Sequence, residues 1–225
     1  MRNHGGPTPA DLRAETKDHG PVRWPTFGEP RSVTVRAHGG RASGLSFPDV
    51  VPLRLNLGCG GRKLDGYVNI DVVQQRGDSV PDIVADVADL SRFPERCVDE
   101  ILAVHVVEHF WRWEVLEVLK GWVRLLKPGG KMILECPNLV SACQVFLDNP
   151  EAGAGAGKEG QRTMWVFYGD PAWRDPLMVH RWGYTPKSLA QLMFKAGLKE
   201  LRQEPAQFKL REPRDMRVTG IRPLV

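Results

Sequence analysis

The chain has 225 residues, a formal net charge of +4 and 42% hydrophobic residues. This length fits one α/β domain with an extension and allows a sizeable hydrophobic core. No apolar run is long enough to cross a membrane and the N-terminus has no apolar signal segment, so neither a membrane protein nor a secreted protein is expected.

The four cysteines, at positions 59, 97, 136 and 143, show no Cys-x-x-Cys or Cys/His metal spacing. We therefore expect reduced thiols in a cytoplasmic protein and no metal site. Residues 1–50 are rich in Gly, Pro, Arg and His, with only short apolar groups such as Trp24 and Val33–Val35. They predict a partly flexible extension before a domain at residues 51–225.

A glycine-rich turn follows the first predicted strand. Residues 53–57 alternate Leu with polar residues, which indicates a strand in a buried sheet, and Gly58, Gly60 and Gly61 come directly after it. Glycine lets the backbone approach a ligand closely because no Cβ is in the way. A second apolar stretch ends in Asp71, where an acid can accept hydrogen bonds from ribose hydroxyls. The pattern indicates a cofactor site of the nucleotide type.

The spacing disfavours a nicotinamide-dependent oxidoreductase, which is one alternative. Such sites need Gly-x-Gly-x-x-Gly at the start of a helix and an acid about 20 residues further on. Here the third spaced glycine is missing, and Asp71 follows Gly60 by only 71 − 60 = 11 residues. This leaves little room for a pyrophosphate-binding helix, which a cofactor without phosphates does not need.

The sequence Leu-Asn-Leu-Gly-Cys-Gly at 55–60 resembles motif I of the class I S-adenosylmethionine-dependent methyltransferases. With the loop Lys-Leu-Asp-Gly-Tyr at 63–67, the stretch is similar to the small bacterial type 11-like branch. The resemblance implies that S-adenosylmethionine is the cofactor and that Asp71 binds its ribose. It also implies that the backbone around four residues contacts the amino-acid end: Leu57, Gly58, Cys59 and Gly60.

Two further positions carry the resemblance. Residues 83–85 predict a short buried strand, after which Asp86 is expected to accept the adenine amino group while the backbone N–H of Val87 meets a ring nitrogen. The alternative is that Asp86 only caps the following turn. Residues 98–105 predict the fourth strand, and the phrase from Val98 to Phe110 resembles the type 11 signature in which His105 lines the methionine end of the cofactor.

The remaining pattern predicts an α/β fold: a doubly wound, mainly parallel seven-stranded sheet with helices on both faces and an antiparallel C-terminal strand pair. Apolar residues at helical spacing predict a helix over 111–127, which Pro128 and the glycines after it end, and 131–136 reads as a strand. Thr185 and Pro186 open a helix that ends near residue 196. Residues 198–203 and 216–221 are the expected final strands.

Residues 148–184 combine a Gly-Ala stretch with many aromatic side chains. This composition predicts a lid that closes over substrate, with aromatic faces suited to a sugar or a flat ring. The alternative is a hydrophobic cluster that covers the sheet edge. His180 is the first candidate general base, because it falls in this segment, and His109 is the second. Tyr184 and Asp170 are candidate orienting groups, and for His109 a structural role is the alternative.

The resemblance implies methyl transfer to an oxygen or nitrogen of a small molecule or glycan. A nucleic-acid methyltransferase is an alternative, although the Asn/Asp-Pro-Pro-Tyr motif and the Pro-Cys nucleophile are absent after the fourth strand, where the chain reads Val104-His105-Val106-Val107. A non-catalytic subunit with a cofactor fold is the other alternative. The intact Asp71 and glycines argue against it. The oligomeric state stays open.

Overall fold

The computed structural model describes residues 52–153, 158–208 and 215–225. The predicted extension, including Trp24 and Val33–Val35, lies outside these ranges. The strands are β1 (Arg54–Leu57), β2 (Val68–Asp71), β3 (Ile83–Val84), β4 (Val98–Val104), β5 (Leu126–Pro137), β6 (Lys199–Glu204) and β7 (Asp215–Ile221). The helices are α1 (Val115–Leu125), α2 (Leu139–Asp148), α3 (Lys158–Tyr168) and α4 (Pro186–Lys195), with 3₁₀ turns η1 (Val107–His109), η2 (Pro150–Gly153), η3 (Pro171–Trp173) and η4 (Pro176–Met178).

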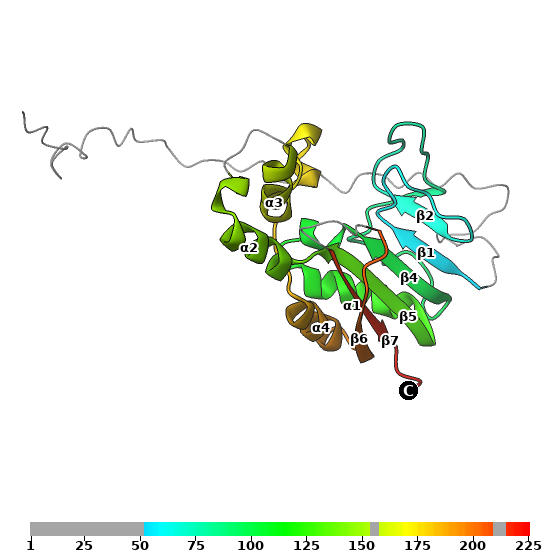
Figure 1. Ribbon diagram of the computed structural model, residues 1–225. Coiled ribbons are helices and arrows are strands. Elements are labelled where there is room, and N and C mark those ends of the chain that lie inside the picture. The colour runs from blue at the N-terminus through cyan, green and yellow to red at the C-terminus, as the bar shows by residue number, and fades with distance from the viewer. Residues whose placement is uncertain (1–51, 154–157, 209–214) are drawn as a thin grey trace, which may run out of the picture. The chain divides into compact units, whose positions relative to one another are not determined.

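The strands form one seven-stranded sheet in the order β3-β2-β1-β4-β5-β7-β6 (Figure 1). Strands β1 to β5 are parallel to one another, and β7 is antiparallel to both β5 and β6. This confirms the predicted fold class and its antiparallel C-terminal pair. The chain runs outward from β1 to β3 and then returns to the other side of β1, so a topological switch point lies at the carboxyl ends of β1 and β4.

The register brings the predicted site residues to this switch point. Leu57, the last residue of β1, pairs with Ile70 of β2 and with Ala103 of β4. The residues that follow each strand therefore leave the sheet at the same edge. Gly58, Asp71 and His105 lie there together.

Helices α1 and α4 cover the same face of the sheet, because they contact each other and the strands beneath them. Trp122 of α1 is 1% exposed, and its indole N–H donates to the carbonyl of Val87 at 2.7 Å. The predicted helix over 111–127 is shorter than expected. It ends at Leu125, because Leu126 pairs with Val98 and begins β5.

Successive residues of a strand point to opposite faces of the sheet. The face away from α1 and α4 carries pairs of polar side chains that bond across neighbouring strands. Asn56 and Asn69 are register partners whose side chains bond at 2.9 Å, and Glu135 and Arg217 are register partners bonded at 3.1 Å. Direct cross-strand pairs of this kind stabilise one register. The β1–β2 and β2–β3 connections are loops, since each is close to the minimum length for a helical crossover.

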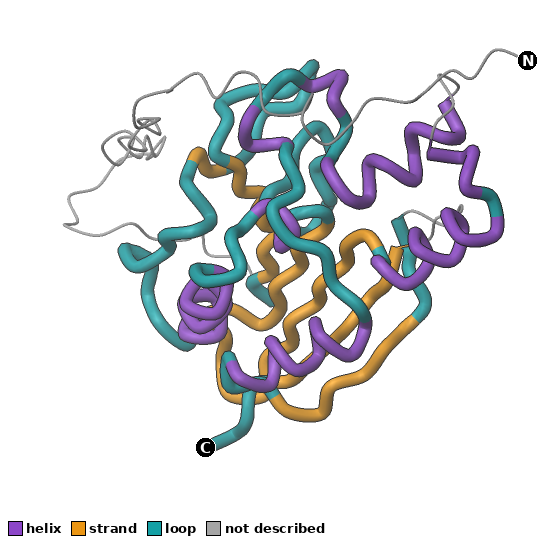
Figure 2. The backbone as a smooth tube through the Cα atoms, turned by 90° about the vertical axis from the view of Figure 1, so that its left-hand side faces the viewer, coloured by secondary structure: helices purple, strands orange, loops and turns teal. Residues whose placement is uncertain are grey.

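Helices α2 and α3 pack on each other and on η2 at the carboxyl end of β5. Figure 2 looks from this side and shows loops and helices in front of the strands. Helix α3 belongs to the predicted lid segment, residues 148–184, and α2 ends at its first residue; neither helix was predicted from the sequence. Of the described helices, none is both long and apolar enough to cross a bilayer.

Candidate functional site

The turn after β1 requires glycine at its first position. Gly58 has a φ of +65° and Gly60 a φ of +55°, both in the left-handed region that disfavours side chains. A Cβ on Gly58 would also lie 2.6 Å from Cγ2 of Val106. The glycine turn therefore packs directly against the chain that leaves β4.

The Asp71 carboxylate holds this turn in place. One oxygen accepts a hydrogen bond from the backbone N–H of Gly60 at 2.7 Å, and the other accepts from Val73 N–H at 3.0 Å. The side chain is buried, yet each oxygen keeps a second lone pair. The sequence-predicted group of Leu57, Gly58, Cys59, Gly60 and Asp71 is thus brought together by the fold, and a cofactor hydroxyl fits the remaining acceptor capacity of Asp71.

Asp86 and Val87 follow β3 near the edge of the sheet. The exposed Asp86 accepts a hydrogen bond from Ala88 N–H at 2.9 Å, which is the turn cap given above as the alternative role. Val87 is buried, and its carbonyl already accepts from Trp122. Neither contact involves the Val87 N–H. Adenine binding by this pair stays a prediction.

His105 lies between two carboxylates at the end of β4. Its Nδ1 is 3.0 Å from Oε1 of Glu108 and its Nε2 is 2.8 Å from Oδ2 of Asp215. Burial alone would lower the pKa of His105, but the bonds to Asp215 and Glu108 raise it to about 10. His105 is therefore an imidazolium at neutral pH. It orients Glu108 rather than accepting a proton.

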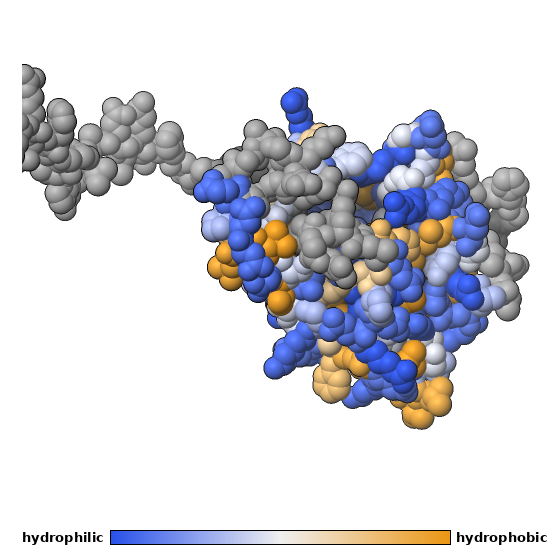
Figure 3. Space-filling view, in the orientation of Figure 1, coloured by the Kyte–Doolittle hydropathy of each residue, from blue (hydrophilic) through white to orange (hydrophobic). Residues whose placement is uncertain are grey.

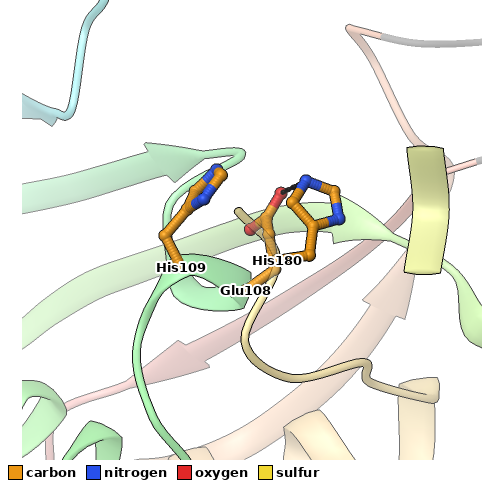
Figure 4. Close-up of side chains that lie close together, drawn as sticks. All are labelled: Glu108, His109 and His180. Atoms are coloured by element: carbon orange, nitrogen blue, oxygen red, sulfur yellow. Dashed lines mark ion pairs between the residues drawn. The ribbon is translucent and has the colours of Figure 1, made fainter. Parts of the chain in front are cut away.

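Glu108, His109 and His180 form a second cluster beside His105, in which one ligand-type atom from each residue lies within 4.8 Å of the others. Figure 4 shows the Glu108 carboxylate between the two imidazole rings. The two rings meet edge to face with centroids 4.9 Å apart. The two histidines proposed from the sequence as bases are thus neighbours in space.

Both histidines are held by backbone carbonyls in the same way. Nδ1–H of His109 donates to the carbonyl of Val179 at 3.1 Å, and Nδ1–H of His180 donates to the carbonyl of Val166 at 3.0 Å. This fixes the tautomer, so in each neutral ring Nε2 carries the lone pair. His180 Nε2 is 4.0 Å from Oε1 of Glu108, which is too long for a hydrogen bond.

The predicted lid segment returns to η1 and positions His180. Backbone N–H groups of Arg181 and Trp182 both donate to the carbonyl of Glu108, at 2.7 and 3.2 Å. His180 N–H donates to the carbonyl of Tyr168 at the end of α3. The loop that brings His180 to Glu108 is therefore anchored on both sides.

The electrostatics of the cluster keep Glu108 charged and His109 neutral. Burial would raise the pKa of Glu108, but the hydrogen bond from His105 and the neighbouring histidine charges lower it to about 2. Burial lowers the pKa of His109. Glu108 is 2% exposed, and among the described residues its Oε2 has no hydrogen-bond partner.

The candidate orienting groups have other contacts. Asp170 caps η3 by accepting from Ala172 N–H at 2.9 Å. Tyr184 is buried, which raises the pKa of its hydroxyl, and within the described part of the chain that hydroxyl has no hydrogen-bond partner. Sequence reasoning missed Asp215 altogether. It reaches His105 only through the pairing of β7 with Pro137 at the end of β5, and no local motif marks that contact.

The segment also reaches across to the loop after β2. The guanidinium of Arg76 lies 4.8 Å from the ring centroid of Trp173, and its Nη1 is 3.4 Å from Sδ of Met178. Several of the segment's large side chains are exposed: Tyr168, Trp173, Leu177, Val179 and Trp182. Figure 3 shows a further apolar patch over α2, where Val140, Phe146 and Leu147 are exposed.

The chain was compared with known protein families and solved structures. Residues 66–134 match the type 11 family model described as "Methyltransferase domain". The chain is similar to a solved S-adenosylmethionine-dependent methyltransferase from Archaeoglobus fulgidus, with 15% identity and a TM-score of 0.49 over 75% of this chain and 85% of that chain. It is also similar to one from Methanosarcina mazei, with 17% identity and a TM-score of 0.49 over 76% of this chain and 92% of that chain. A third similar structure is the Burkholderia thailandensis 1,6-didemethyltoxoflavin-N1-methyltransferase, solved with S-adenosylhomocysteine. Its identity is 15% and its TM-score 0.46, over 76% of this chain and 71% of that chain. No curated protein matches the chain.

The family match covers β2 to the middle of β5, the part of the sheet that holds Asp71 and His105. The strand order and the glycine turn extend the agreement to both sides of that region. The match to the methyltransferase-domain model over residues 66–134 therefore supports a class I S-adenosylmethionine-dependent methyltransferase.

Proposed function

We propose that the protein transfers a methyl group from S-adenosylmethionine to an oxygen or nitrogen atom of a small molecule or glycan. The observation that carries this proposal is the left-handed Gly58–Gly60 turn, bonded through Gly60 N–H to Asp71 where β1 and β2 end. When bound, S-adenosylmethionine supplies a methyl group made electrophilic by the sulfonium. The chain itself must bind the cofactor and the acceptor, align the acceptor atom with the methyl group, and exclude water.

Each predicted cofactor residue has a role in this proposal. The backbone of Leu57 to Gly60 holds the amino-acid end, and the spare lone pairs of Asp71 accept the ribose hydroxyls. Asp86 and the N–H of Val87 hold the adenine. His105, fixed between two carboxylates, lines the end of the site where β4 leaves the sheet.

Proton removal from the acceptor is assigned to His180, and secondly to His109. Their Nδ1–H groups are held by backbone carbonyls, so the Nε2 lone pairs are the available basic atoms. The negative Glu108 beside them stabilises the imidazolium that forms when either ring takes a proton. Both residues are therefore proposed to act on a hydroxyl or amine of the acceptor.

Residues 148–184 are proposed to act as the acceptor-binding lid. Two observations support this: the segment contacts η1 at one side and Arg76 at the other, and it presents exposed aromatic rings such as Trp173 and Trp182. Aromatic faces suit stacking on a sugar or a flat ring. A reducing, cytoplasmic compartment is proposed as well, because the four cysteines are free.

Calorimetric titration of the purified full-length protein with S-adenosylmethionine tests the cofactor assignment. We expect micromolar binding, weakened about tenfold or more in Asp71→Asn, since loss of hydrogen bonds to a charged acceptor costs about 1.5 kcal/mol or more. Asp89→Asn is the matched control, because Asp89 is exposed and bonds only the turn at Ser91. No binding at millimolar cofactor, or equal binding by both variants, contradicts the proposal.

A second assay then identifies the acceptor. Production of S-adenosylhomocysteine is measured with panels of hydroxylated small molecules, amines and oligosaccharides. Single-stranded and duplex nucleic acids are included, because turnover with them alone would favour the alternative acceptor class. Loss of turnover in His180→Ala, with cofactor affinity retained, is the result expected if His180 acts on the acceptor.

A further inference from the structure

The side chains of Glu108, His109 and His180 converge from two parts of the chain. Glu108 and His109 belong to η1, and His180 lies at the end of the lid segment. The three ligand-type atoms lie within 4.8 Å of one another (Figure 4). We propose that Glu108, His109 and His180 bind one divalent transition-metal ion.

The donor set suits a first-row transition ion. Two imidazole nitrogens and one carboxylate are the ligands of the facial-triad iron sites and of several catalytic zinc sites. Magnesium and calcium prefer oxygen ligands only. Ligands bonded at about 2.1 Å are about 3.0 Å apart when adjacent and about 4.2 Å apart when opposite. Separations of up to 4.8 Å must therefore shorten by up to about 1.8 Å, through side-chain rotation, for all three ligands to occupy adjacent positions.

The surroundings of the two rings match those of metal-bound histidines. A ligating histidine normally donates its other ring N–H to a carbonyl or carboxylate, which sets the tautomer and the ring orientation. Both rings do so here, through Val179 and Val166, and His180 leaves its Nε2 4.0 Å from Oε1 of Glu108. Two independent carbonyls thus prepare the same donor atom on both residues.

A buried oxygen of Glu108 also points to a bound cation. Its Oε1 is bonded to His105, but Oε2 is buried and has no hydrogen-bond partner among the described residues. An unpartnered buried carboxylate oxygen is costly, and a bound cation removes that cost. His105 then has the role of a residue that orients a metal ligand.

Three protein ligands leave further coordination positions on the ion. This step rests on the proposed function: an acceptor with one or two oxygen donors would fill them, and coordination lowers the pKa of a bound hydroxyl. The site lies near the cofactor turn in space. Gly58 of that turn packs against Val106, and Val106 directly precedes η1. The same Nε2 lone pairs cannot bind a metal and a proton at once. The histidine-base role proposed above therefore applies to the metal-free protein, and in the metal-bound protein the ion takes the place of the two bases.

Titration of EDTA-treated, tag-free full-length protein with Co²⁺ tests the site, with the visible absorption of bound Co²⁺ and metal analysis after dialysis as readouts. We expect one Co²⁺ per chain, displaced by Zn²⁺. The Co²⁺ affinity should fall by more than about 100-fold in His109→Ala and in His180→Ala, because each variant lacks one ligand. Loss of a ligand's hydrogen-bond partner alone already costs about 10- to 100-fold in affinity. Glu108→Gln is the third variant.

The controls are Glu117→Gln, an exposed glutamate on α1, and Cys143→Ser, an exposed thiol on α2. Both should bind Co²⁺ as the wild type does. Wild-type protein that takes up less than stoichiometric Co²⁺, or histidine variants that bind it equally well, overturns the proposal. If Glu108→Gln does not fold, the wild-type stoichiometry and the two histidine variants still decide. S-adenosylmethionine is titrated into the same metal-free protein, so that failure of the metal site and failure of the proposed function are recorded separately.

Discussion

Replacing Gly58 by alanine tests whether the cofactor turn is built on close backbone contact. The change introduces two costs. A left-handed φ costs about 1–2 kcal/mol for a residue with a Cβ. The new Cβ lies 2.6 Å from Cγ2 of Val106, a stiff β-branched side chain, and such overpacking costs typically about 1–3 kcal/mol. We expect Gly58→Ala to destabilise the protein by about 2–5 kcal/mol in total.

Two other glycines separate these costs. Gly66 has a φ of +76° and no atom within 4 Å of an added Cβ, so Gly66→Ala should show the backbone cost alone. Gly121 is inside α1 and is equally open, so Gly121→Ala should stabilise by about 0.5–1 kcal/mol. Urea unfolding of the three variants gives the free energies. At about 2–4 °C per kcal/mol, the melting temperature of Gly58→Ala should fall by about 4–20 °C.

The difference between Gly58→Ala and Gly66→Ala measures the contact with Val106. Equal losses in the two variants would refute the reasoning that the turn packs against the chain leaving β4. A Gly58→Ala protein as stable as the wild type would refute it as well. Because this turn carries the proposed contact to the amino-acid end of the cofactor, S-adenosylmethionine binding should weaken in Gly58→Ala and stay unchanged in Gly121→Ala.

Arg217→Met should destabilise by about 3 kcal/mol in urea unfolding, because it leaves the fully buried Glu135 without its charge partner. Asp99→Asn should destabilise by less than about 1 kcal/mol at pH 7, since the partner Lys127 is partly exposed. The hydrogen bond from Lys127 lowers the pKa of Asp99, so this difference should shrink as the pH falls below about 3.9 and disappear once the pH is below the lowered pKa of the folded state. Burial raises the pKa of Cys59 to about 11, so mass spectrometry should find it poorly alkylated by iodoacetamide at pH 8.

Each of these results has a control within the chain. Arg202 is exposed on β6, and Arg202→Met should change stability by less than about 0.5 kcal/mol. The exposed Cys143 should be alkylated before Cys59. An Asp99→Asn effect that does not shrink as the pH falls below about 3.9 would contradict the assignment to a charged carboxylate. Rapid labelling of Cys59 would contradict its burial beneath the cofactor turn.

The sequence was sufficient for most of the sheet because strands such as β1, β2 and β4 are short, largely apolar runs with clear ends. The alternation in residues 53–57 and the Thr185–Pro186 helix start both predicted elements that the structure confirms. Thr185 and Ser188 form the reciprocal capping bonds expected of such a start. The end of α1 was less predictable, because Leu126 continues the helical spacing but gains a strand partner in Val98. Tertiary pairing decided that boundary.

The candidate site was only partly predictable for a related reason. His109 and His180 were singled out one by one, but their approach depends on the two backbone bonds that attach the end of the lid segment to Glu108. The contact of His105 with Asp215 depends on the antiparallel register of β7. Contacts between residues so distant in the chain leave no local pattern. The sequence analysis expected no metal site because it looked for short Cys and His spacings. Such spacings give no information about ligands that are far apart in the chain.

The place of β7 has a consequence for the order in which the protein can assemble during synthesis. Although β7 is the last described strand along the chain, it lies inside the sheet, between β5 and β6. While the ribosome is still making residues 215–221, β6 has no partner strand and the imidazolium of His105 lacks one of its two anions. Long-range pairing of this kind forms late. A nascent chain can therefore complete β1 to β5 early, but the cluster of charged residues around His105 reaches its final arrangement only after β7 has left the ribosome.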